Sequence, residues 1–170
     1  MTPPVGDRDH IQGAATAPMT LVEYGDYQCP VCGQAYSIVK ELQTRLGERL
    51  CFVFRNFPLA TMHHYAEQAA EAAEAAGGHG KFWEMHDMLY ENQDALGEED
   101  FAQYAAALGL DPSRFASELT THTYAARVHE DFISGARSGV NGTPTFFING
   151  VRHDASFDLE TMLGAIEGTR

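Results

Sequence analysis

Residues 19–34 read MTLVEYGDYQCPVCGQ, and the fold is predicted from this stretch. Its first part, residues 19–24, is short, apolar and partly β-branched, which predicts a buried strand that ends at Gly25. Cys29 and Cys32 follow this strand with two residues between them. A close cysteine pair has three common uses: it holds a metal, locks a structure or exchanges electrons with other thiols.

A helix and a second strand are expected after the cysteine pair. From Pro30 to about Leu46 the apolar residues recur at helical spacing, and Gly47 is a stop signal. Proline suits the first helical position because its missing N–H costs no hydrogen bond there. The continuous apolar run at residues 50–54 predicts a strand covered on both faces. Short connections between these elements predict a βαβ unit with a parallel pair of strands.

The middle of the chain, residues 61–139, has helical patterns throughout. In AEQAAEAAEAA the residues Glu67, Glu71 and Glu74 fall on one helical face, and the alanines leave a flat surface for close packing. Residues 111–112, Asp-Pro, predict the N-cap and first turn of a further helix.

The C-terminal part changes character. The stretch TPTFFINGVRHD predicts two antiparallel strands, because its Asn-Gly pair at residues 149–150 favours a two-residue hairpin. An amphipathic helix follows, with apolar residues at i, i+3, i+4 and i+7 from Leu159. The order βαβ, helical block, ββα predicts an α/β thioredoxin-like fold with a helical insertion. The predicted parts are an N-terminal extension at 1–18, an N-terminal half of the fold at 19–60, a mainly helical insertion with a connecting helix at 61–139, and a C-terminal half at 140–170.

Composition limits the possible partners and locations. The net charge of −13 repels phosphate backbones and anionic membrane surfaces, so we expect neither nucleic-acid binding nor membrane insertion. No apolar run approaches the length of a bilayer span. The N-terminal sequence MTPPVGDRDHIQG lacks the features of a secretory signal, which predicts a cytoplasmic protein if Met1 is the true start. If the sequence is trimmed, a periplasmic or exported protein is expected instead.

The predicted strand-to-helix junction gives the two cysteines different properties. Cys29, at the helix N-terminus, faces unpaired N–H groups and the positive end of the helix dipole, both of which favour a thiolate. Cys32 lies one turn further along and is the expected resolving thiol. Pro30 and Val31 supply no polar group to a thiolate, so the helix terminus must provide most of the activation.

A second sequence feature, Thr143-Pro144, directly precedes the predicted hairpin. Local sequence alone favours an ordinary trans proline, since cis X-Pro bonds are a small minority. The predicted fold reverses that preference, because a cis bond beside the cysteine helix would expose the Thr143 backbone to an extended substrate chain.

Taken in order, the motifs EYGDYQCPVC, FRNFPL, KFWEMHDMLY and GVNGTPTFFINGV resemble the DsbA-like thiol:disulfide oxidoreductases of the thioredoxin superfamily. The resemblance runs from about His10 to the C-terminus. It implies that Cys29 is the nucleophile, that Cys32 is the resolving cysteine and that Thr143-Pro144 is the cis-proline pair.

The resemblance also places Glu23 where family members have a buried acid that influences the cysteines and relays a proton. The alternative is a solvent-exposed glutamate at a strand end. Val31 departs from the best-known periplasmic members, which have histidine there, so the sequence leaves open whether the chain oxidises, reduces or isomerises disulfides.

The implied partners are proteins that contain thiols or disulfides, together with a redox partner. We expect no metal and no cofactor other than a Cys29–Cys32 disulfide, since the nearest candidate ligands, His63 and His64, are neighbours that tend to point apart. Cys51, in a predicted buried strand, is expected to act as a small hydrophobe, with a regulatory thiol as the alternative.

Two other classes of function remain. One is a glutathione-dependent transferase or isomerase like the kappa class, which shares an inserted helical domain. Its members typically have serine at the position of Cys29 and lack the resolving cysteine. The other is a non-catalytic binding module, metal-loaded or chaperone-like.

Overall fold

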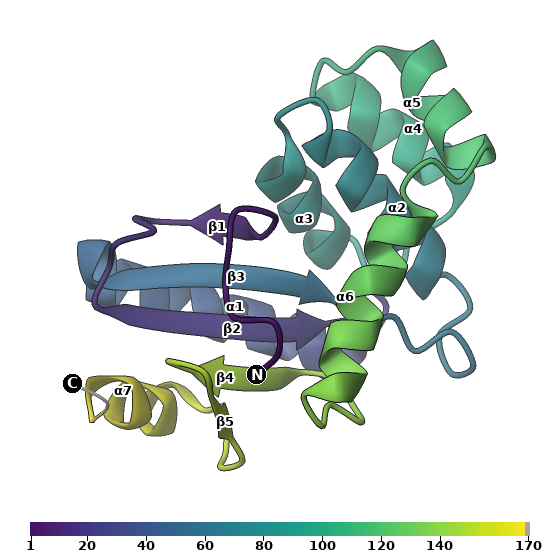
Figure 1. The fold of residues 1–170 in the computed structure, drawn as a ribbon. Helices are drawn as coiled ribbons and strands as arrows, with labels where there is room; N and C mark the ends of the chain where they lie inside the picture. Colours follow the sequence, from purple (N-terminus) through teal and green to yellow (C-terminus); the bar gives the residue numbers. More distant parts are fainter. Residues whose placement is uncertain (169–170) are drawn as a thin grey trace.

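The computed structural model describes residues 1–168, and within them the strands form one five-stranded sheet with the order β1-β3-β2-β4-β5 (Figure 1). β2 and β3 are parallel, and each of the other neighbouring pairs is antiparallel. The predicted mixed sheet is therefore confirmed. Residues 169–170, at the end of the predicted C-terminal half, lie outside the described part. The strands are β1 His10–Gln12, β2 Met19–Gly25, β3 Leu50–Asn56, β4 Thr145–Ile148 and β5 Val151–His153.

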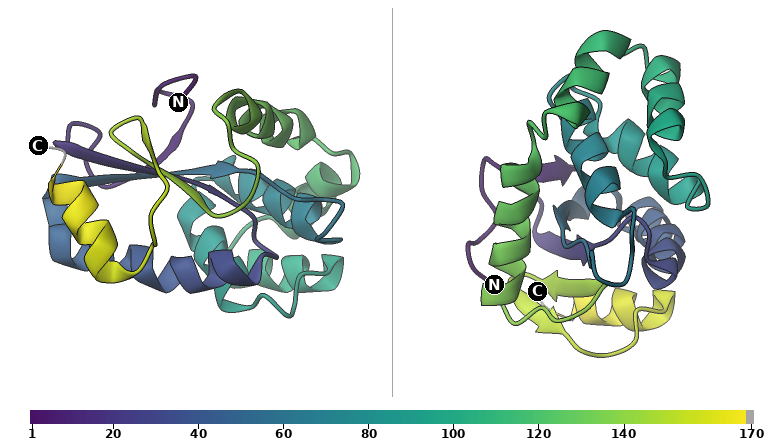
Figure 2. Two further views of the ribbon diagram at one scale, coloured as in Figure 1. Left: turned by 90° about the horizontal axis from the view of Figure 1, so that it is seen from below. Right: turned by 90° about the vertical axis from the view of Figure 1, so that its right-hand side faces the viewer.

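Helices cover both faces of the sheet. Figure 2 shows α1 and α7 on one face and α6 on the other, while α2 to α5 gather beside the sheet as the predicted helical block. In the described residues no helix is both long enough and apolar enough to span a bilayer. The helices are α1 Pro30–Leu46, the 3₁₀ turn η1 Gly47–Arg49, α2 Ala66–Gly77, α3 Phe82–Glu91, α4 Glu98–Ala107, α5 Pro112–Thr120, α6 Ala125–Arg137 and α7 Leu159–Glu167.

Two hydrophobic cores lie on the two faces of the sheet. Because side chains alternate along a strand, neighbouring residues of β2 enter different cores. Leu21 packs in the core that contains α1 and α7, whereas Val22 packs in the core that contains Phe132 of α6. The side chains of β3 alternate between the same two cores. Both strands therefore read as apolar runs without a polar face, as the sequence predicted.

Local sequence signals set the ends of two helices and the position of one hairpin turn, as predicted. Asp111 caps α5 by accepting hydrogen bonds from two backbone N–H groups. Gly47, with φ of 53°, ends α1. The hairpin between β4 and β5 turns at Asn149 and Gly150, whose φ angles of 48° and 83° fit the predicted two-residue turn.

The edge strand β1 was not predicted. It lies within residues 1–18, pairs with β3 and places Ile11 opposite Val53. Its His10 ring stacks on Phe82 at a centroid distance of 3.6 Å. The strand was missed because three residues of mixed polarity carry no recognisable period.

Two of the three glutamates on one face of α2 are buried, as is its alanine face, while Glu67 is exposed. Glu71 and Glu74 are only 8% and 3% exposed. His122 lies 3.0 Å from Glu71, and His10 lies 2.9 Å from Glu74. The Glu71 and Glu74 side chains are covered because β1, α5 and α6 pack around α2. The sequence pattern predicts the faces of this helix but not the elements that pack on them.

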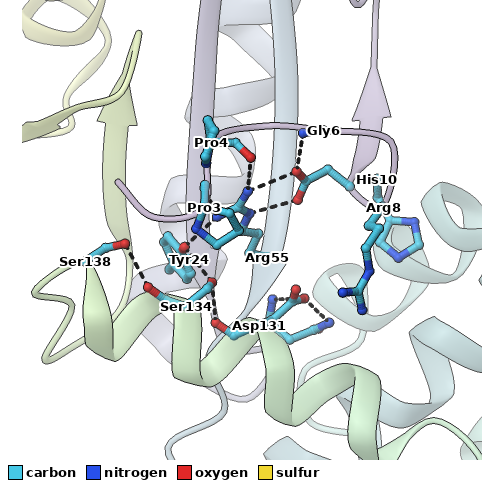
Figure 3. Close-up of polar contacts among 12 residues, drawn as sticks. Pro3, Pro4, Gly6, Arg8, His10, Tyr24, Arg55, Asp131, Ser134 and Ser138 are labelled. Carbon is cyan, nitrogen blue, oxygen red and sulfur yellow. Dashed lines mark hydrogen bonds and ion pairs between the residues drawn. The ribbon is translucent and has the colours of Figure 1, made fainter.

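An arginine fixes the N-terminal segment to the sheet (Figure 3). The Arg55 side chain, 3% exposed, donates to both carboxylate oxygens of Asp9 at 2.8 and 2.9 Å. It also donates to the backbone oxygens of Pro3 and Pro4 and to the hydroxyl of Tyr24. We call these five residues the Arg55 clamp. Each guanidinium nitrogen has a partner, so the clamp compensates the cost of burying the charge.

Candidate active site

The cysteine pair lies where β2 ends and α1 begins, as predicted. Cys29 is the N-cap of α1, with φ of −69° and ψ of 120°, and Pro30 occupies the first turn. The Cys29 sulfur accepts a hydrogen bond from the Cys32 backbone N–H, with a distance of 3.5 Å between the two atoms. An N–H of the first helical turn, which has no partner within the helix, therefore points at the sulfur that would carry the negative charge.

The two thiols differ in acidity. The Cys32 thiol, followed by the N–H of Cys32, stabilises the Cys29 thiolate and lowers the pKa of Cys29 to about 5 despite its burial. Burial raises the pKa of Cys32 far above its ordinary value. Cys29 is 5% exposed and Cys32 is fully enclosed. At neutral pH Cys29 is therefore a thiolate within reach of a partner, and Cys32 is a protected thiol.

The loop before β4 is distant from Cys29 in the sequence but contacts it in the structure. The Thr143–Pro144 peptide bond is cis. The Cys29 sulfur lies 3.7 Å from the Thr143 carbonyl oxygen, to which it donates a hydrogen bond when Cys29 is a protonated thiol. Pairing of β2 with β4, in which Tyr24 is opposite Thr145, brings these distant segments together.

Two loops around the cysteines are joined through Asp26. Its fully buried carboxylate accepts hydrogen bonds from the backbone N–H groups of Gln28 and Leu59, and His63 Nδ1 lies 2.7 Å from it. His63, a candidate metal ligand in the sequence, is thus already paired. Within residues 1–168 no group of three or more His, Cys, Asp or Glu side chains is arranged to hold a metal.

Apolar side chains are exposed near the thiolate. Val31, between the two cysteines, is 42% exposed, and Met62 and Tyr65 lie exposed in the loop after β3. The side chain of Gln28 accepts a hydrogen bond from the Tyr65 N–H at 2.7 Å, which holds this loop beside the cysteine loop. An apolar partner surface can therefore approach Cys29 without meeting a charged residue between the cysteines.

Gln93, just after α3, was not singled out in the sequence. Its Nε2 donates to the backbone oxygens of Tyr27 and Cys29, both at 2.9 Å. A Cβ at Gly33 would lie 2.2 Å from Gln93 Oε1, so only glycine allows this approach. An isolated glycine inside a helical pattern was the one available signal.

Glu23 is buried, which settles the choice that the sequence left between a buried and a solvent-exposed position. It is 2% exposed and lies on the same face of β2 as Leu21, toward α1. Burial, and then the charge of Cys29, raise the pKa of Glu23 to about 8. The Glu23 charge in turn contributes to the raised pKa of Cys32. The acid and the resolving thiol therefore influence each other's protonation.

Replacing Glu23 with glutamine is expected to stabilise the reduced protein at pH 9. A carboxyl group whose pKa is raised in the folded state stabilises the fold fully below its unfolded pKa, and this stability is lost as the pH rises toward 8. Glu23→Gln removes that loss, so its free energy of unfolding at pH 9 should exceed wild type by about 2–4 kcal/mol. Urea unfolding at pH 4 and pH 9 measures the difference. The exposed Glu67→Gln serves as control, and an equal pH response in both variants contradicts the prediction.

A mixed sheet with a helical insertion and a dithiol at the start of its first long helix is an arrangement that this chain shares with the DsbA-like proteins. The chain belongs to the thioredoxin family, whose model matches residues 6–168. The predicted family and fold class are therefore confirmed.

Solved structures agree with this assignment. BdbD from Bacillus subtilis is 26% identical with a TM-score of 0.85, over 95% of this chain and 92% of that chain. A thioredoxin-like oxidoreductase from Silicibacter pomeroyi, 24% identical, has the same fold with a TM-score of 0.84, over 97% of this chain and 94% of that chain. MdbA from Corynebacterium diphtheriae, a thiol-disulfide oxidoreductase 17% identical, also shares the fold, with a TM-score of 0.75 over 96% and 90% of the two chains.

Curated relatives of this chain are named Na⁺/H⁺ antiporters. A Na⁺/H⁺ antiporter, NhaA 1 of Salinispora arenicola, is 48% identical over 166 residues, which cover 98% of this chain and 25% of the antiporter. An NhaA antiporter of Herminiimonas arsenicoxydans is 39% identical over 171 residues, covering 100% of this chain and 27% of its own. This chain thus spans about a quarter of the length of the curated relatives it matches.

Proposed function

We propose that this chain exchanges disulfides with protein substrates through Cys29 and Cys32. The observation that carries the proposal is the pairing of a stabilised thiolate at a helix N-terminus with a buried thiol one turn away. The Cys29 thiolate attacks a substrate disulfide, forms a mixed disulfide and releases one substrate thiolate. Cys32 then attacks the Cys29 sulfur, which forms the Cys29–Cys32 disulfide and releases the second substrate thiolate. The reverse sequence oxidises a substrate dithiol.

Two other groups take part in this proposal. Glu23 accepts the proton that Cys32 must lose before its attack, since it is the buried carboxyl group whose charge affects the Cys32 pKa. The Thr143 backbone binds an extended substrate segment by strand-like hydrogen bonds, because its carbonyl already contacts the Cys29 thiol.

The direction of exchange depends on how far the active-site disulfide is destabilised relative to the dithiol. The Val31 side chain adds no charge or hydrogen bond to the Cys29 thiolate, although its backbone N–H helps to lower the Cys29 pKa, so we propose an active site less oxidising than one with a charged residue between the cysteines. The cytoplasmic location stays a prediction. Equilibration of the pair with glutathione or dithiothreitol buffers gives the reduction potential, which indicates the direction when compared with that of the compartment.

The proposed exchange is tested with the purified chain. The chain should accelerate insulin reduction by dithiothreitol or the oxidation of reduced RNase. A Cys32→Ser variant should accumulate a mixed disulfide with insulin in the absence of dithiothreitol, visible as a mass increase that added dithiothreitol reverses. If the wild-type chain catalyses neither reaction and the Cys32→Ser variant traps no substrate, the proposal is wrong.

We also propose that this dithiol unit works together with a Na⁺/H⁺ antiporter. The supporting observation is that antiporter relatives match 98% of this chain at up to 48% identity. The Salinispora arenicola protein, with this chain in place of its matched residues, would be assayed for Na⁺-driven proton movement in membrane vesicles. Transport should respond to dithiothreitol and to a thiol oxidant, and should lose this response when both active-site cysteines are replaced by serine. An identical response with and without the cysteines rejects the association.

A further inference from the structure

Three side chains converge on Gly25, the last residue of β2. A Cβ at this position would lie 2.9 Å from the Tyr90 hydroxyl, 3.0 Å from Glu23 Oε1 and 2.5 Å from Phe54 Cε2. Any side chain at residue 25 would therefore displace all three groups. The absence of a side chain allows a tyrosine hydroxyl of the helical block and a carboxyl group of the sheet to approach the same point.

The Tyr90 ring is fixed in place by aromatic neighbours. It lies 4.8 Å from the Tyr27 ring and 5.3 Å from the Tyr36 ring, and it meets Phe54 edge-on at 6.2 Å between centroids. Tyr90 is 6% exposed. Because three rings from other elements surround it, its hydroxyl points at Gly25 as a consequence of core packing.

The two oxygens that face Gly25 are buried without a hydrogen-bond partner among residues 1–168. The neighbouring tyrosines differ in this respect. The Tyr27 hydroxyl lies 2.9 Å from His86 Nδ1, and the Tyr36 hydroxyl donates to Glu91 at 3.0 Å. Buried polar atoms in proteins almost always have partners. Two unpaired oxygens beside one glycine therefore suggest that they interact in one protonation state of the site.

We propose that Tyr90 is a positioning residue for Glu23: its hydroxyl donates a hydrogen bond to the Glu23 carboxylate whenever that group is ionised. The inference rests on the proposed disulfide exchange, in which Glu23 accepts the proton of Cys32. A donor that binds only the charged form favours that form and makes the base more available. Tyr90 thus controls the rate of the second step, the attack by Cys32, and leaves the first step unchanged.

The proton and electron balance of that second step is complete. The Cys32 thiol gives its proton to the Glu23 carboxylate, and the Cys32 sulfur bonds to the Cys29 sulfur. The bond between Cys29 and the substrate breaks, and its electron pair leaves on the substrate sulfur, which takes a proton from solvent. The protein dithiol is oxidised and the substrate disulfide is reduced.

The ionisation of the neighbouring groups is consistent with this role. Burial, and then the charges of Cys32 and Glu23, raise the pKa of Tyr90, so it stays a neutral donor. In the reduced protein, in which the Cys29 charge adds to the effect of burial, a Glu23 pKa of about 8 leaves about one Glu23 in ten ionised at pH 7. The titratable groups that face Glu23 or Tyr90 come from several elements: Cys29 at the N-cap of α1, Cys32 and Tyr36 of α1, Asp26 and Tyr27 of the loop before it, and His86 of α3, whose ring lies 5.1 Å from that of Tyr90.

The test compares Tyr90→Phe with Tyr36→Phe, which removes a hydroxyl from the same aromatic cluster but not from Gly25. Reduced protein is mixed with a disulfide-linked peptide, quenched in acid at short times and analysed by mass, so that formation and resolution of the mixed disulfide are timed separately from pH 6 to pH 10. Tyr90→Phe should shift the pH midpoint of resolution upward by about one unit. Resolution should be about tenfold slower at pH 7 and near wild type at pH 10. Tyr36→Phe should follow wild type throughout.

Two further measurements separate this role from a structural one. In a Cys32→Ser background, Tyr90→Phe should leave the rate of mixed-disulfide formation unchanged. In a Glu23→Gln background, it should have no further effect on resolution, as expected for residues that act as one unit. An unshifted midpoint in Tyr90→Phe overturns the inference while the exchange itself still proceeds. If the wild-type chain forms no mixed disulfide at all, the proposed function fails instead.

Discussion

Replacing Cys29 with serine is expected to lower the rate of disulfide exchange by about a thousandfold or more. The thiolate is the reacting species, and a serine hydroxyl does not ionise in this pH range. Cys32 cannot take over, because it is fully enclosed and burial raises its pKa far above neutrality. The loss should therefore be as large as the full contribution of the nucleophile.

The measurement is insulin reduction or RNase oxidation at pH 7, with Cys51→Ser as the matched control. Cys51 is also a buried cysteine, but it lies in the core on the opposite face of the sheet from the active site. Its replacement should leave the rate within a factor of two. Activity that survives in Cys29→Ser, or that disappears in Cys51→Ser, would contradict the assignment of the nucleophile.

Replacing Arg55 with methionine is expected to lower the free energy of unfolding by about 3–5 kcal/mol. The change leaves the Asp9 carboxylate buried without its guanidinium partner, and leaves the oxygens of Pro3 and Pro4 without a donor (Figure 3). Urea unfolding at pH 7 measures the loss. Arg45→Met, which removes an exposed ion pair with Glu41, should change stability by no more than about 0.5 kcal/mol.

The pH dependence of the same variant distinguishes the ion pair from simple packing. Burial alone would raise the pKa of Asp9, but hydrogen bonds from Arg55 and from the Gly6 N–H outweigh it and hold the pKa below its ordinary value. In wild type this group adds stability above its unfolded pKa, and that contribution disappears as the pH falls through the folded pKa. In Arg55→Met the penalty should shrink on acidification, because protonation removes the unpaired charge. A penalty that does not change with pH would show that Arg55 acts through packing alone.

Much of the fold could be predicted because its signals are local. The strand at residues 19–25, the proline at the start of α1 and the Asn-Gly turn each specify their conformation within a few residues. The cysteine pair was placed at the start of α1 for the same reason, since a strand and a helix signal flank it directly.

What could not be predicted depends on contacts between distant segments. The burial of Glu23 is set by β4 on one side and α1 on another, and no residue near it in the sequence specifies either. Gln93 and Tyr90 reach the site from α3 and the turn after it, more than 55 residues beyond Cys29. β1 acquires its role only by pairing with β3. Periodicity describes the face of one element and does not identify what packs on it.

The contacts of Gln93 mean that the inserted block and the cysteine site form a single structural unit. One side chain from the insertion holds the carbonyl of the nucleophilic cysteine, and the glycine after the second cysteine leaves room for it. A shortened version without the insertion would remove these donors and uncover the buried carboxyl group of Glu23. Transplanting the CPVC sequence alone into another scaffold would therefore move the thiols but leave behind the groups that set their chemistry.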